Sequence, residues 1–149
     1  MRKMASQVHD CLSNREVVQT ANNIIAALPS RDTMAQVDAL QDWLGHRFRF
    51  VPDPIGVELL RDPAFGVHEM NTLGYTQGDC DEEAMDAACL GMVIGLAARF
   101  RSLAFNSPNA PYTHVICDLA SNGHWYPIDI TRPEGFVIPP ISRTLILSV

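Results

Sequence analysis

The chain has 149 residues, 47% of them hydrophobic and 19% charged, which suffices for one sizeable core but not for two ordinary domains. Its net charge of -6, without any run of Lys or Arg, argues against binding to nucleic acid or to an anionic membrane. No apolar stretch approaches the length of a membrane span, and polar residues interrupt the basic start before it resembles a signal peptide. We therefore expect a single cytoplasmic domain over residues 1–149.

Two amphipathic patterns predict helices in the first third of the chain. Ser13 and Glu16 stand at the spacing of a capping box, and apolar residues at helical intervals follow as far as Leu28. A second pattern of the same kind covers residues 34–44. We therefore expect a helical part that extends to about residue 50.

A buried central helix is expected after a long connection. The turn at 52–54 and the scattered Gly and Pro of 55–77 predict that connection, with at most one short helix in it. Asp79 can cap a helix, and Glu82 three positions later completes a capping box. The helix that begins there with Cys80 is apolar on nearly all faces past its first two turns, which indicates burial. One face carries small residues, which would let the helix approach a sheet closely: Cys80, Ala84, Ala87, Ala88, Gly91 and Gly95.

Three strand-like runs follow the central helix. They cover 99–105, 112–119 and 124–130, and Asn122-Gly123 between the last two is a hairpin signal. The apolar, Pro-rich tail over 136–149 is expected to add an edge strand lying over the core. Helices followed by an antiparallel meander predict an α+β fold.

Cys80 is the candidate nucleophile. Unpaired backbone N–H groups and the positive end of the helix dipole favour a thiolate at a helix start, which predicts a lowered thiol pKa. A thiolate needs a base, and of the five histidines His114 lies mid-strand in the element expected beside the central helix. The other cysteines show no CxxC spacing, so we expect Cys89 and Cys117 in the core and Cys11 to be incidental.

Asp129 is the candidate for the group that orients the imidazole. A hairpin that pairs symmetrically about Asn122-Gly123 sets Asp129 opposite Ile116, one diagonal step from His114. A shift of one residue in the register would break this alignment. The pattern predicts a triad of Cys80, His114 and Asp129.

A metal site is the alternative use of these side chains. His114 and Cys117 have the spacing of a ligand pair, but residues three apart on a strand point to opposite faces and cannot bind one metal ion together. No paired ligand motif occurs elsewhere in the chain. We therefore expect neither a metal nor another cofactor. The residues whose side chains could serve as metal ligands are Cys80, His114, Cys117, Asp118 and His124.

Three segments together resemble the transglutaminase-like superfamily over about residues 78–132. The run 78–100 has the family's Gly-x-Cys opening, an Ala- and Leu-rich helix, and a Gly-Leu-x-Ala-Arg segment that leads into a strand. Tyr-Thr-His-Val at 112–115 is similar to the strand of the catalytic His. Residues 123–129 are similar to the signature Gly-x-Trp, two residues, hydrophobic, Asp.

The resemblance implies a papain-like α+β core, over about residues 70–135, with Cys80 as nucleophile, His114 as base and Asp129 as orienting residue. The implied chemistry is acyl transfer through a thioester on a protein or peptide substrate. Hydrolysis, as in a protease or amidase, is favoured over transfer to an amine because the chain is small. The Cys80 backbone N–H is the natural oxyanion donor, and the side chains of Gln77 and Tyr75 are further candidates.

Departures from the family pattern leave a second hypothesis open. Ala97 stands where the family usually has Pro, and the acids Asp81, Glu82 and Glu83 oppose a thiolate unless His114 is protonated. The acidic surroundings of the Cys also look like versions encoded by bacteriophages and prophages, in which case the protein would act in a bacterial host cell. The alternative is a non-catalytic scaffold in phage assembly; a peptide deglycosylase or cell-wall amidase is a narrower enzymatic alternative. The sequence leaves the oligomeric state open.

Overall fold

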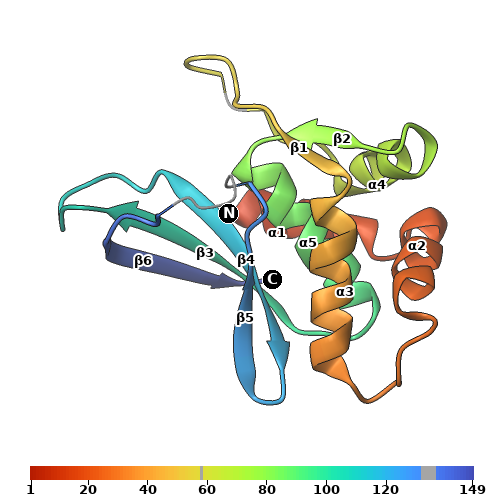
Figure 1. Cartoon of the computed structure of the whole chain (residues 1–149). Helices are drawn as coiled ribbons and strands as arrows, with labels where there is room; N and C mark the ends of the chain where they lie inside the picture. Colours follow the sequence, from red (N-terminus) through yellow and green to blue (C-terminus); the bar gives the residue numbers. More distant parts are fainter. Residues whose placement is uncertain (58, 132–136) are drawn as a thin grey trace.

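The computed structural model describes residues 1–57, 59–131 and 137–149, which form an α+β fold. The central helix α5 lies between a four-stranded antiparallel sheet on one side and the other helices on the other (Figure 1). The helices are α1 (Arg2–Cys11), α2 (Arg15–Ile25), α3 (Thr33–Gly45), α4 (Pro63–Thr72) and α5 (Cys80–Val93). The strands are β1 (Phe48–Phe50), β2 (Thr76–Gly78), β3 (Ala98–Phe105), β4 (His114–Ser121), β5 (His124–Ile128) and β6 (Ile141–Ser148).

The small-residue face of α5 packs directly on β4. Ala84, Ala87 and Ala88 are completely buried. Gly91 approaches the sheet so closely that a Cβ atom there would lie 2.6 Å from a methyl group of Leu119. Small side chains therefore bring the backbone of α5 against β4, as the sequence pattern predicts.

The sheet order is β5-β4-β3-β6, and the β4–β5 hairpin has the predicted register. Asn122 and Gly123 both have positive φ, 52° and 78°, which suits a two-residue type I′ turn. The pairs Ser121↔His124 and Cys117↔Ile128 continue that turn symmetrically. Asp129 follows the last paired residue of β5, so the predicted alignment of the hairpin is confirmed.

The N-terminal helices differ from the sequence prediction in two ways. Helix α1 was not predicted, and Asn14 rather than Ser13 caps α2. The Asn14 side chain accepts hydrogen bonds from the backbone N–H groups of Glu16, at 2.9 Å, and Val17, at 3.2 Å. The Glu16 carboxylate instead contacts His68 on α4, at 3.0 Å, so it joins two helices rather than closing a capping box.

The long connection and the tail hold more regular structure than expected. Strands β1 and β2 form a short parallel pair, and α4 lies between them in the chain. Strand β6 pairs with β3 and is the predicted edge strand, but most of its residues are exposed, so it extends the sheet instead of covering the core. The start of the predicted tail at Phe136 lies outside the described residues.

A buried ion pair fastens α5 to the segment before α4. Arg61 Nη2 donates to Asp86 Oδ2 at 2.8 Å, and their side chains are 15% and 1% exposed. Burial raises the pKa of Asp86 to about 7, and the Arg61 guanidinium opposes this rise. Gly66 leaves the space for that guanidinium, because a Cβ atom at this position would overlap it.

We expect Gly66→Ala to destabilise the fold by about 3 kcal/mol, the scale for breaking a buried ion pair. The new methyl group would push the guanidinium away and leave the Asp86 carboxylate buried without its cation. Urea unfolding of the variant measures the loss. The matched control is Gly45→Ala, also in a helix, where a Cβ would meet nothing closer than 3.9 Å and should add stability. Equal stabilities for the two variants would contradict the prediction.

Candidate active site

Cys80 is the first residue of α5, and a complete capping box holds that helix start. The Asp79 side chain accepts from the Asp81 backbone N–H at 2.9 Å, and Glu82 Oε2 accepts from the Asp79 N–H at 2.9 Å. Glu82 Oε1 also accepts from the Arg61 N–H at 3.2 Å. Two of the acids near Cys80 are thereby committed to building the helix start, as the capping-box pattern predicts.

The Cys80 side chain opens into a cavity of about 310 Å³. His114 lines the same cavity from the start of β4, so the structure brings these two predicted site residues into one hollow. Four further lining residues were not predicted as site residues, although three of them stand beside His114 in its motif. The lining residues are Asp79, Cys80, Asp81, Ser102, Tyr112, Thr113, His114 and Val115.

Asp129 holds the imidazole of His114. The two meet at 2.9 Å between His114 Nε2 and Asp129 Oδ2, with side chains 12% and 15% exposed. Because a carboxylate only accepts hydrogen bonds, the imidazole donates from Nε2, and Nδ1 is left as its basic nitrogen. The hydroxyl of Thr131 donates to Asp129 Oδ1 at 2.9 Å, which fixes the carboxylate in turn.

The thiol of Cys80 is protonated and held against an acid. Its S–H donates to Asp81 Oδ1 at 3.8 Å. Burial raises the pKa of the Cys80 thiol to about 12, and the nearby carboxylates of Asp81 and Asp79 raise it further, against the lowering effect of the Val115 backbone N–H. The lowered pKa predicted from the helix start is therefore wrong, because burial and two acids outweigh the helix terminus. A base must remove this proton before the sulfur can act as a nucleophile.

Glu83 is the acid near Cys80 whose surroundings differ most from the sequence prediction. It is completely buried, and neither of its carboxyl oxygens has a hydrogen-bond partner in the described residues. Burial raises the pKa of Glu83 well above its ordinary value, and the charges of Asp129 and Asp86 act in the same direction. Burial therefore favours the uncharged form of Glu83 over a charge beside Cys80. The sequence did contain a signal for this burial: Glu83 follows Cys80 by one turn, on the same face of the helix.

The proton on Glu83 makes the stability of the fold depend on pH. Because the pKa is higher in the folded than in the unfolded chain, the folded state binds more protons above about pH 4.5. The free energy of unfolding should therefore fall as pH rises, by up to about 1.4 kcal/mol per pH unit. Glu83→Gln should make this slope shallower between pH 5 and 8 in urea unfolding, because the raised pKa of Asp86 still contributes to it. A variant of an exposed acid, Asp10→Asn, should keep it; parallel curves for Glu83→Gln and wild type would contradict the prediction.

The two side chains predicted as oxyanion donors lie elsewhere. Gln77 lines a different hollow, beside Asp53 and Leu59, and the Tyr75 ring packs under the guanidinium of Arg49 at 3.6 Å from its centroid. The Cys80 backbone N–H lies close enough to its own sulfur to lower the thiol pKa. Of the three predicted oxyanion donors, the Cys80 N–H is therefore the one that lies next to the sulfur of Cys80.

One group of possible metal ligands lies at this site. Within the described residues, Asp79, Cys80 and Asp81 bring one ligand atom each to within 4.8 Å of one another. The side chain of Asp79 already caps α5. The three residues are consecutive at a helix start, so their closeness needs no metal ion to explain it. Asp118, one of the ligand types considered, is fully buried between Arg99 and Arg101 at 2.8 and 2.7 Å.

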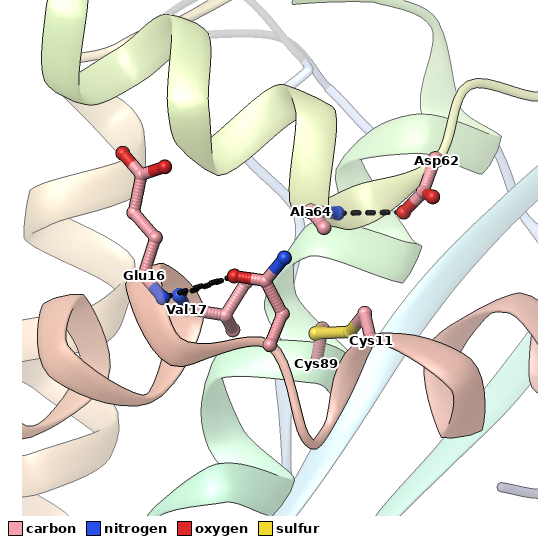
Figure 2. The surroundings of a disulfide bond; sticks show 7 residues. Cys11, Glu16, Val17, Asp62, Ala64 and Cys89 are labelled. Carbon is pink, nitrogen blue, oxygen red and sulfur yellow. Dashed lines mark hydrogen bonds between the residues drawn. A yellow bond between two sulfur atoms is a disulfide. The ribbon is translucent and has the colours of Figure 1, made fainter.

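Cys11 and Cys89 form a disulfide that joins the end of α1 to α5 (Figure 2). The prediction of Cys11 as incidental is therefore wrong, and Cys89 is a buried core residue with a covalent partner. None of the helices in the described parts of the chain is both long and apolar enough to cross a membrane. Disulfides are rare in cytosolic proteins, so this bond does not support the cytoplasmic location, which stays a prediction.

Comparison with known proteins identifies a similar fold and no family. No protein-family model matches the chain, and no curated protein matches its sequence. A crystal structure described as "a putative protease" from Parabacteroides distasonis ATCC 8503 superposes with a TM-score of 0.68 over 98% of this chain, at 11% sequence identity. The chain spans 28% of the length of that protein. The fold of this protein thus resembles part of the protein that bears this description.

Proposed function

We propose that the protein is a transglutaminase-like cysteine hydrolase that cleaves amide or peptide bonds through a thioester on Cys80. The observation that carries the proposal is that His114, which lines the same cavity as Cys80, donates a hydrogen bond to Asp129. A partly buried acid that orients an imidazole near a thiol is an arrangement suited to cysteine acyl transfer. The fold shared with part of a protein described as a protease agrees with this reaction class.

In the first half of the proposed reaction, Cys80 replaces the amine of the scissile bond. His114 Nδ1 takes the thiol proton as the sulfur attacks the carbonyl carbon, and the backbone N–H of Cys80 stabilises the oxyanion. The tetrahedral intermediate then breaks its C–N bond. The imidazolium gives its proton to the departing amine, and the acyl group stays on Cys80 as a thioester.

In the second half, water releases the acyl group. Neutral His114 removes a proton from the water as its oxygen attacks the thioester carbon, and the C–S bond breaks. The carboxylic acid leaves, and the imidazolium returns the proton to the sulfur. An amine in place of water would give transamidation by the same steps; the small chain favours water.

The first test is the labelling of Cys80 by iodoacetamide, followed by mass spectrometry. Because the resting thiol has a pKa of about 12, its reactivity at neutral pH depends on the base. We expect His114→Ala to lower the labelling rate at least about tenfold at pH 7. Iodoacetate should react more slowly than iodoacetamide in the wild type, since the carboxylates of Asp79 and Asp81 line the cavity and repel an anion.

The chain carries its own control for this labelling. Cys117 is the other free cysteine of the described residues and is completely buried, so it should stay unlabelled while the protein is folded. An unreactive Cys80, or a rate indifferent to His114→Ala, would sink the proposal.

Turnover is tested on a library of peptides, with and without an added primary amine. New carboxyl ends would support hydrolysis, whereas amine incorporation would support transamidation, and Cys80→Ala should abolish either. A labelled Cys80 with no product in either assay would favour the non-catalytic scaffold predicted as the alternative. The bacteriophage-type origin stays a prediction from the sequence.

A further inference from the structure

Glu83 is buried beneath the candidate site and takes no part in the steps above. It follows Cys80 by one turn of α5 and lies on the same helix face, with its side chain wholly removed from solvent. In the described part of the chain, neither carboxyl oxygen meets a hydrogen-bond donor with good geometry. Fully buried acids are rare unless they are paired, so this one calls for a role.

The neighbours of Glu83 connect it to the segment that carries Asp129. Of the charged groups, Asp129 acts on it most strongly and Asp86, on its own helix, comes next. The backbone N–H of Ile130 faces its carboxyl without reaching hydrogen-bond geometry. From β4, the buried thiol of Cys117 faces it. Glu83 thus stands where α5, β4 and the residues after β5 meet.

We propose that Glu83 is a positioning residue for Asp129: its buried carboxyl faces the Ile130 backbone N–H and so holds the neighbouring Asp129 against His114. This inference rests on the proposed function, in which Asp129 orients the base. An ionised Glu83 would set two negative charges close together, and would push the 129–131 segment away from α5. The positioning therefore requires the proton.

Two variants separate this role from simple packing. Glu83→Gln keeps a polar carbonyl oxygen that faces the Ile130 N–H, whereas Glu83→Leu keeps the bulk and removes that oxygen. The readout is the downfield proton resonance of the His114 Nε2–H that donates to Asp129, together with the rate of Cys80 labelling. Glu83→Gln should retain both at neutral pH. Glu83→Leu should lose the resonance and label at least about tenfold more slowly, as expected for a displaced catalytic group.

The pH dependence supplies a readout that packing alone would not move. As pH rises, the wild type should lose the resonance when Glu83 ionises, and Glu83→Gln should keep it to a pH on the order of half a unit higher or more. Three results would each overturn the inference. The wild type and Glu83→Gln would lose the resonance at the same pH, Glu83→Leu would keep the resonance and the reactivity, or Glu83→Gln would lose them. If Glu83→Leu fails to fold, the comparison of wild type with Glu83→Gln still decides it.

The resonance also separates the two proposals. It reports the hydrogen bond between His114 and Asp129 and needs neither a substrate nor a reactive Cys80. An inert Cys80 beside a resonance that responds to Glu83 as expected would defeat the hydrolase proposal and leave the positioning in place. A reactive Cys80 with a resonance indifferent to Glu83 would do the opposite.

Discussion

Asp129→Asn should lower the rate of peptide cleavage by roughly 10³–10⁴-fold while the protein stays folded. Asp129 accepts the Nε2–H of His114 at 2.9 Å, which leaves the lone pair on Nδ1. An Asn amide can instead donate to Nε2, and the proton then moves to Nδ1, where it blocks the base. The rate is measured on the best peptide of the library, with circular dichroism to confirm folding.

The matched control is Thr131→Val, which removes a hydrogen bond to the same carboxylate but leaves its charge. Thr131 Oγ1 donates to Asp129 Oδ1 at 2.9 Å. Its loss should slow cleavage by about tenfold or less, since the carboxylate still accepts from His114. An Asp129→Asn variant no slower than Thr131→Val would show that Asp129 does not select the tautomer of the imidazole.

Reduction of the Cys11–Cys89 disulfide should lower the free energy of unfolding by about 4 kcal/mol. The bond closes a loop of sequence separation 78, and its release returns that entropy to the unfolded chain. Thermal unfolding with and without dithiothreitol measures the effect, which corresponds to a drop of roughly 10 °C in the midpoint.

The double variant Cys11→Ser with Cys89→Ala is the control for the reductant. It should unfold at a lower temperature than the oxidised wild type and be indifferent to dithiothreitol. Cys80 and Cys117 are free thiols, so the described chain offers the reagent no other disulfide. A wild type whose unfolding midpoint ignores dithiothreitol would contradict the assigned bond.

The parts of the fold that local sequence encodes were predictable. The capping box at Asp79 and the small-residue face of α5 are signals within one helix, and the Asn122-Gly123 turn sets the register of its own hairpin. Helix α1 was missed although its buried residues Met4 and Val8 stand at helical spacing, because no capping side chain marks its start. The choice between Ser13 and Asn14 as cap lies within the usual ambiguity of helix ends.

The features that depend on tertiary contacts could not be predicted from local sequence patterns. A disulfide between residues far apart in sequence requires the two helices to be packed first. The helix start predicts a reactive Cys80, but its pKa is set by burial and by the acids around it, which the helix dipole argument does not contain. The sequence predicts a negative charge on Glu83 beside Cys80, whereas the fold places this side chain in the core, where burial opposes the charge.

The two-residue turn between β4 and β5 makes this site unusually intolerant of changes in chain length. Side chains alternate between the faces of a strand, so one inserted or deleted residue at Asn122-Gly123 would exchange the faces of β5. Ile128 would then leave the core and Asp129 would turn away from His114. Homologues that vary in length should therefore do so in the long connection before α4, and keep this turn at two residues.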